Sequence, residues 1–136
     1  MDFSELVDNF SFLDSWEDRY AYLIELGRDL PPMDDADKTP ENKVEGCMSQ
    51  VWLKMRRDGE RLFFRGESDA FIVRGLIAVL QIILSGKTTA EIAAEDVEAD
   101  FNKLGLDAHL SPTRRNGFFS MVARVKAEAA GPRGDL

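Results

Sequence analysis

Few residues in this sequence can do nucleophilic or acid–base chemistry near neutral pH: there is one cysteine, Cys47, and one histidine, His109. A single cysteine cannot form an internal disulfide, and four-thiolate metal sites need several such ligands. Most free cysteines are small packing residues, but a packing cysteine more often lies inside an apolar run. Cys47 instead follows Gly46 at the end of a loop, where a glycine allows a sharp turn or the close approach of another molecule. This position predicts a functional thiol.

The chemistry open to this thiol is limited by its neighbours. A hydrolytic nucleophile needs an adjacent base, and His109 lies far from Cys47 in sequence, so we expect a packing or capping role for the histidine. Lys43 would lower the pKa of the thiol and Glu45 would raise it, which leaves the thiolate fraction open. A thiol that only receives and passes on a group needs less machinery, because a partner can supply the activation.

The elements that must position Cys47 begin with an amphipathic helix over residues 14–30. Its apolar residues recur at helical spacing, with Asp14 and Glu17 placed as a capping box and Gly27 as a stop. Residues 31–43 combine prolines and acids without any helical or strand period. They predict a surface loop that leads to the cysteine.

A hairpin is predicted directly after the cysteine, over residues 50–68, with an Asp-Gly turn at Gly59. Two strands alone would be marginally stable, so we expect a third, short strand near residues 43–46. Trp52 and Phe63 are typical of the core of such a sheet.

Helix signals fill the rest of the chain. Ser68 is placed to cap a helix over residues 69–85, Thr88 to cap the next, Gly105 to end a short acidic helix, and Ser111 to begin the last one. Two adjacent strands among helices predict an α+β fold, in which helices cover one face of a small antiparallel sheet.

Length and charge narrow the class of protein. A chain of 136 residues suits one domain, which we place at residues 1–130, with a flexible tail at 131–136. The formal net charge of -8 argues against nucleic acid and anionic membranes as partners. The N-terminus carries acids where a signal peptide carries bases, and the apolar run 70–86 is interrupted by Arg74 and Gln81. We therefore predict a cytoplasmic protein.

Three blocks of the sequence, KVEGCMSQVWL, GESDAFIVRGLIAVL and LGLDAHLSPTRRNGF, resemble the SufE family of sulfur acceptors for cysteine desulfurases. The resemblance extends over about residues 10–129. It implies the SufE/NifU-like two-layer fold, with helices on a three-stranded antiparallel sheet. Cys47 matches the persulfide acceptor in the G-C-x-S motif of the family. Asp69 matches the acid of its S-D-A motif, and Arg114 the arginine after Ser-Pro-Thr, both implicated in docking or in positioning the cysteine loop.

The resemblance also implies partners and cofactors. A SufS- or CsdA-like desulfurase would carry the pyridoxal phosphate, so no cofactor or metal is expected in this chain, and a SufBCD-like iron–sulfur scaffold would receive the sulfur. The chain would be a sulfur-transfer carrier and desulfurase activator rather than a stand-alone catalyst. It departs from the family at Met48, where a glutamine is common.

Alternatives to this interpretation remain at the level of the sequence. An adaptor would regulate a desulfurase without taking sulfur itself, and a redox sensor would use the single thiol to detect oxidants. Asp69 in the first turn of a helix would be favourable against the helix dipole without any docking role, and Arg114 would be an ordinary solvated charge.

Overall fold

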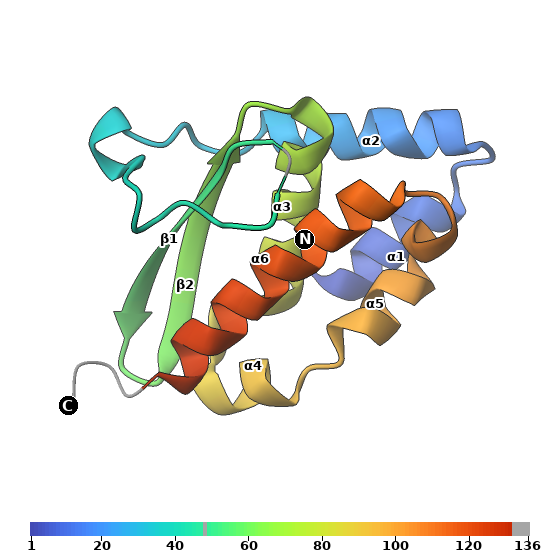
Figure 1. The fold of residues 1–136 in the computed structure, drawn as a ribbon. Coiled ribbons are helices and arrows are strands. Elements are labelled where there is room, and N and C mark those ends of the chain that lie inside the picture. The colour runs from blue at the N-terminus through green and yellow to red at the C-terminus, as the bar shows by residue number, and fades with distance from the viewer. Residues whose placement is uncertain (48, 132–136) are drawn as a thin grey trace.

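A three-stranded antiparallel sheet with helices on one face forms the fold in the computed structural model, which describes residues 1–47 and 49–131 (Figure 1). The α+β architecture predicted from the sequence is therefore confirmed. The family difference noted at Met48 and the tail residues 132–136 lie outside the described residues. The elements are α1 (Phe3–Ser11), α2 (Trp16–Arg28), η1 (Asp35–Asp37), β1 (Val51–Asp58), β2 (Arg61–Ser68), α3 (Phe71–Leu84), β3 (Lys87–Thr88), α4 (Thr89–Ala94), α5 (Val97–Lys103), η2 (Leu106–Ala108) and α6 (Pro112–Ala130).

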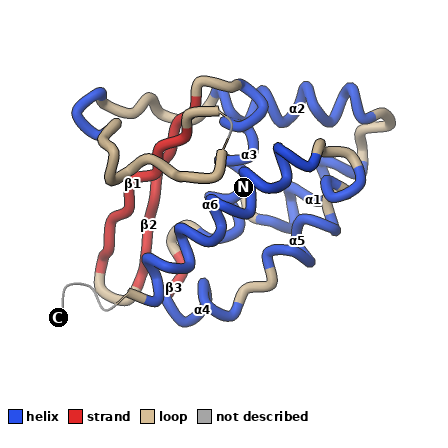
Figure 2. The backbone as a smooth tube through the Cα atoms, viewed as in Figure 1, coloured by secondary structure: helices blue, strands red, loops and turns tan. Residues whose placement is uncertain are grey.

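The hairpin of β1 and β2 forms most of the sheet (Figure 2). Its register runs from the pair Val51–Ser68 to the pair Asp58–Arg61, and Gly59 in the predicted turn has a φ of 62°, in the left-handed region. Side chains alternate between the two faces, so one face is apolar and covered by helices. The buried apolar side chains of that face are Val51, Leu53, Leu62 and Phe64.

The third strand lies elsewhere than the sequence predicted. It is β3, which pairs antiparallel with the start of β2, whereas the expected strand at residues 43–46 is reduced to an isolated bridge between Lys43 and Trp52. The prediction for residues 43–46 is therefore wrong. β3 has only two residues between the turn at Gly86 and the start of α4 at Thr89, too few to show a strand alternation in sequence.

Trp52 and Phe63 were predicted in the core of the sheet, and this is wrong. The alternation of β1 and β2 puts both on the outer face, opposite to Leu53. Cations lie over their rings: the Lys38 ammonium is 5.6 Å from the ring centroid of Trp52, and the Arg56 guanidinium is 4.5 Å from that of Phe63. The outer face thus combines aromatic rings with positive charge.

The start of α3 also differs from the prediction. Ser68 still belongs to β2, where it pairs with Val51, so it does not cap the helix. The Ser68 hydroxyl accepts the Ala70 N–H at 3.2 Å, and the helix begins at Phe71 without a side-chain cap. Asp69 consequently lies in the turn before the helix and not in its first turn. Asp69 therefore does not have the place in the first turn of the helix that the helix-dipole interpretation assumed.

Two other helix starts are confirmed. Thr88 and Glu91 form a capping box at α4, with backbone-to-side-chain hydrogen bonds in both directions. Ser111 accepts the Arg114 N–H at 3.2 Å at the start of α6, with Pro112 as the first helical residue. The Ser111 cap fixes where the last helix begins, and therefore which of its residues face the rest of the fold.

The helices α2 and α3 cross where two glycines meet. A Cβ added to Gly27 would lie 2.6 Å from the backbone nitrogen of Gly75, and one added to Gly75 would lie 2.2 Å from the carbonyl oxygen of Leu23. Gly27 was predicted to stop its helix, but α2 continues to Arg28, so that prediction is wrong. Gly27 is instead required by the close approach of the two helices.

The core is centred on α3, which contacts both α2 and β2, while α6 contacts α3 and β1. Within the described residues, no helix is both long enough and apolar enough to span a membrane. The buried side chains of α3 are Val73, Leu76, Ile77, Ala78, Val79, Leu80, Ile83 and Leu84.

A pair of carboxyl groups lies where α4 and α5 meet α6. Asp100 is only 6% exposed, its Oδ2 receives no hydrogen bond from the described residues, and burial together with a hydrogen bond to Glu95 raises its pKa to about 7. The pKa of Glu95 is lowered, first by that same bond and further by Lys87, 3.3 Å away. Two ionised carboxylates cannot form a hydrogen bond with each other, so the pair shares one proton.

This pair predicts that Asp100→Asn stabilises the protein at alkaline pH. Asp100 ionises near its usual value of 3.8 in the unfolded chain but near 7 in the folded protein, so the free energy of unfolding falls between these pH values. The lowered pKa of Glu95 offsets part of this loss of stability. We expect Asp100→Asn to raise the free energy of unfolding by about 2 kcal/mol at pH 8. Thermal unfolding from pH 4 to pH 8 measures this, with the exposed Asp14→Asn as control. A gain that is equally large at pH 4 would contradict the shared proton.

Candidate functional site

Cys47 lies in the loop between α2 and β1, and both ends of the cysteine-bearing part of that loop are held. On the N-terminal side, the Arg124 guanidinium of α6 donates to the carbonyl oxygens of Glu41 and Lys43, the latter at 3.1 Å. On the C-terminal side, the Asp69 carboxylate accepts the Gln50 N–H at 3.1 Å. Hydrogen bonds between residues that are far apart in the sequence therefore fix the position of the thiol.

The middle of the loop rests on α6. Gly46 has a φ of 89°, and a Cβ there would lie 2.6 Å from the Ser120 hydroxyl oxygen. The Cys47 thiol lies directly over Gly117, and its Sγ is 3.6 Å from the Gly117 carbonyl oxygen. Gly117, Ser120 and Arg124 are spaced by three and four residues and so lie on one side of the helix. We call these three residues the α6 cradle.

A cavity of about 240 Å³ opens beside the thiol. Apolar side chains of α3 and α6 line part of it, and polar residues line the rest. The Arg114 guanidinium borders this cavity, and its Nη1 is buried without a hydrogen-bond partner among the described residues. The residues around the cavity are Cys47, Ser49, Val73, Leu76, Thr113, Arg114, Gly117, Phe118 and Met121.

The surroundings of the thiol disfavour its ionised form. Cys47 is half-buried, and this burial, followed by the negative charge of Glu45, raises its pKa above the usual value of 9.0. His109 does not border the cavity: its ring stacks on Trp16 at a centroid distance of 3.9 Å, and its carbonyl oxygen accepts the Tyr20 hydroxyl. The packing role predicted for His109 is confirmed, and Cys47 has no histidine base.

The three candidate residues from the sequence are all connected to the cysteine loop or to its cavity. Cys47 and Arg114 border the same cavity, and Asp69 holds the loop three residues after the cysteine. The sequence analysis missed Ser120 and Arg124. Their only signal was helical spacing from Gly117 in the last helix, which does not by itself reveal what lies on that side of the helix.

Fold and site together define a small α+β protein that holds one half-buried thiol beside a cavity. A family model described as "Fe-S metabolism associated domain", that of the SufE family, matches residues 4–129. Two uncharacterized SufE-like proteins are similar along nearly the whole chain. That of Rhizobium meliloti (strain 1021) is 52% identical over 131 residues, which cover 93% of this chain and 94% of the relative. That of Rhizobium etli is 50% identical over 129 residues, which cover 92% of this chain and 87% of the relative.

The fold is also similar to a solved structure, the solution structure of a hypothetical protein from Thermus thermophilus. The TM-score is 0.75 at 18% identity, over 93% of this chain and 92% of the other. At that identity the likeness concerns the fold alone. The family model and the two relatives show that the chain belongs to the SufE family, which associates it with iron–sulfur metabolism.

Proposed function

We propose that Cys47 accepts sulfur as a persulfide from a cysteine desulfurase and carries it to an iron–sulfur assembly scaffold, and that this uptake of sulfur stimulates the desulfurase. Membership of the SufE family supports the pathway. The single observation that carries the proposal is a half-buried thiol with a raised pKa, held over a cavity whose described residues include no histidine or carboxylate base. Such a thiol is quiescent alone and becomes reactive when a partner moves the loop.

The transfer step needs no external oxidant. The Cys47 thiolate attacks the terminal sulfur of the desulfurase persulfide, a new S–S bond forms, and the donor S–S bond breaks. The donor cysteine leaves as a thiolate, and the proton of Cys47 passes to water or to a base of the partner. Sulfur changes carrier without a net change of oxidation state.

The cavity and Arg114 suit the product of this step. A persulfide adds one sulfur atom to the side chain, and the space of about 240 Å³ beside Cys47 has room for it. Arg114 also borders that space, and its guanidinium, whose Nη1 has no hydrogen-bond partner among the described residues, would give a persulfide anion a charge-assisted hydrogen bond. We propose that Arg114 holds the loaded thiol in this way, in addition to any contact with the desulfurase.

The redox-sensor alternative is less compatible with this site. Sensor cysteines are exposed and have a low pKa, which makes them react quickly with peroxide. Cys47 is half-buried and its pKa is raised. The site thus resembles a protected carrier more than a detector.

Intact mass spectrometry tests the proposal. After incubation with a cysteine desulfurase and free cysteine, the protein should gain one or more sulfur atoms on Cys47 that a reductant removes. An Arg114→Met variant should accept sulfur but lose it faster to a small thiol. An unchanged wild-type mass with each cognate desulfurase would refute the carrier function.

Asp69 allows loop positioning and partner docking to be separated. Asp69→Ala removes the acceptor for the Gln50 N–H, so the loop should open more often and Cys47 should be alkylated about fivefold faster, as for a loss of roughly 1 kcal/mol. Asp69→Asn keeps an acceptor oxygen and removes only the charge. It should alkylate at the wild-type rate.

The comparison needs no desulfurase, and sulfur uptake is then measured with one. Suppose that Asp69→Ala and Asp69→Asn are both alkylated at the wild-type rate but take up little sulfur. Asp69 then acts by its charge at the partner, and the positioning role is wrong. Arg124→Ala, which frees the other end of the loop, serves as the positive control for faster alkylation.

A further inference from the structure

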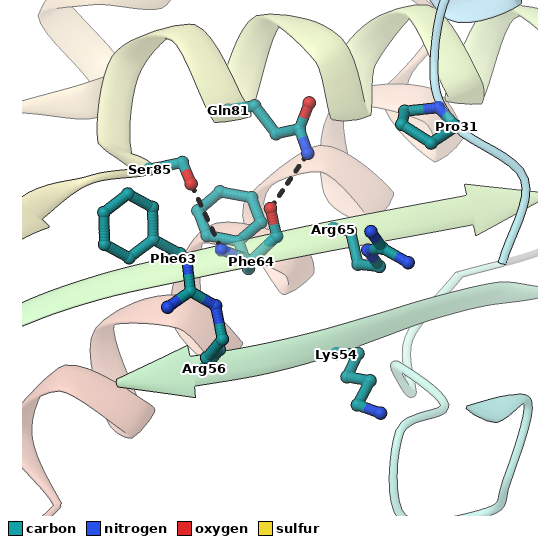
Figure 3. A pocket seen from close by; sticks show the side chains of 8 residues that line it. All are labelled: Pro31, Lys54, Arg56, Phe63, Phe64, Arg65, Gln81 and Ser85. Carbon is teal, nitrogen blue, oxygen red and sulfur yellow. Dashed lines mark hydrogen bonds between the residues drawn. The ribbon is translucent and has the colours of Figure 1, made fainter. Parts of the chain in front are cut away.

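A second cavity lies away from the thiol, between the hairpin and the C-terminal half of α3 (Figure 3). Its volume is about 410 Å³, and none of its residues borders the Cys47 cavity. The residues around it are Pro31, Lys54, Arg56, Phe63, Phe64, Arg65, Gln81 and Ser85. Three of the eight are cations and none is an acid.

The charges at this cavity are not balanced within the described part of the chain. Lys54 and Arg65 are direct cross-strand partners, an arrangement of like charges that destabilises a sheet. Among residues 1–47 and 49–131, only Lys54 of the three cations has an acid within ion-pair distance, Asp37 at 2.7 Å. Arg56 instead lies over the Phe63 ring at 4.5 Å. The site keeps an excess of positive charge on a chain whose net charge is -8.

The arrangement of these cations favours an extended partner over one small anion. In Figure 3 Arg56 lies against Phe63, whereas Arg65 and Lys54 point elsewhere, so the three charged groups do not converge on one point. Arg56 is paired with Phe63, and Arg65 lies two residues further along β2, so Arg56 and Arg65 are diagonal neighbours across the hairpin, about 7–8 Å apart. Acidic side chains at alternate positions of an extended peptide have a similar spacing, and the apolar ring of Phe63 lies beside Arg56 at one end of the cavity.

The edge of β2 at this cavity is already occupied. The Phe64 N–H donates to the Ser85 hydroxyl oxygen at 3.1 Å, and the Gln81 amide donates to the Phe64 carbonyl oxygen at 2.9 Å. These bonds, drawn in Figure 3, leave no free backbone group at Phe64 for an added strand. A partner at this cavity is therefore recognised by side chains.

From these observations we propose that the cavity is a docking site for an extended acidic segment of a partner protein, in which carboxylates alternate with apolar residues. Arg56 and Arg65 bind the carboxylates, and Phe63 contacts an apolar side chain. The site is separate from that of Cys47, because the two cavities share no residue. A partner can thus be held here while the thiol is engaged elsewhere.

A fluorescent peptide in which glutamate alternates with leucine and serine tests this site, with binding read by anisotropy. Its dissociation constant should rise at least tenfold in Arg56→Gln/Arg65→Gln and stay unchanged in the control Arg28→Gln, a change at an exposed arginine outside the cavity. The double variant should fold, because it removes like charges from neighbouring positions. Sulfur uptake by Cys47 should be unaffected in the double variant.

Other outcomes would overturn the proposal. Equal binding of the peptide to wild type and double variant would show that the cavity does not recognise it, as would no binding to either. Tighter binding of inorganic phosphate or of a single-stranded oligonucleotide, abolished in the double variant, would assign the cavity to a different class of ligand. Backbone amide shifts in NMR that centre on α6 instead of β1 and β2 would place the peptide elsewhere.

Discussion

Cys47→Ser protein, mixed with a cysteine desulfurase and free cysteine, is expected to keep its unmodified mass and to leave the desulfurase at its basal rate. Serine preserves the shape of the side chain and removes only the sulfur, so the loop and the α6 cradle should stay in place. A serine hydroxyl does not attack a persulfide under these conditions, because it is almost never ionised near neutral pH. Sulfur uptake should therefore disappear. The faster turnover of the desulfurase, which depends on removal of its persulfide sulfur, should disappear as well.

The same variant separates a carrier from an adaptor. A non-transferring adaptor would still stimulate the desulfurase after Cys47→Ser, because its effect depends on binding alone. The melting temperature of the variant and its affinity for the desulfurase are the controls, and both should match wild type. Full stimulation by a folded, binding-competent Cys47→Ser protein would decide for the adaptor.

Gly75→Ala should destabilise the fold by about 3 kcal/mol or more, at the upper end of the usual cost of overpacking. The added methyl would lie 2.2 Å from the carbonyl oxygen of Leu23, a backbone atom that cannot move without separating α2 from α3. Thermal or urea unfolding measures this loss, and the melting temperature should fall by roughly 10 °C.

Gly117→Ala is the matched control for this substitution. Gly117 also lies inside a helix, but a methyl there would meet the Cys47 sulfur at 3.6 Å, an ordinary contact. Alanine is favoured over glycine in a helix by about 1 kcal/mol, so this variant should be as stable as wild type or more stable. Equal stability of Gly75→Ala and wild type would mean that the two helices do not touch as described.

The fold was predictable where local chemistry decides it. The Asp-Gly turn at Gly59 and the caps at Thr88 and Ser111 follow from the conformational needs of single residues, and all three are confirmed. The start of α3 was not predictable in this way, because Ser68 has the chemistry of a cap but is held in β2 by its pairing with Val51. Tertiary pairing there overrides a local preference.

The site was predictable only in part for a similar reason. Cys47 is recognisable from its loop position and motif, but its pKa depends on burial and on Glu45, whose effects no sequence pattern states. Arg124 reaches the carbonyl oxygen of Lys43 across 81 positions of sequence. The role of Asp69 also depends on a partner, Gln50, from another element. Such contacts are properties of the folded chain.

The α6 cradle has a consequence for where this chain can change in length. One residue inserted between Gly117 and Arg124 would turn everything after it by about 100° around the helix axis, because a turn takes 3.6 residues. Arg124 would then point away from the loop while Gly117 stayed beneath the thiol. An insertion at Gly59, where nothing lies within 4 Å of an added Cβ, would only lengthen a hairpin turn. Insertions and deletions should therefore be accepted at that turn and rejected within this part of α6.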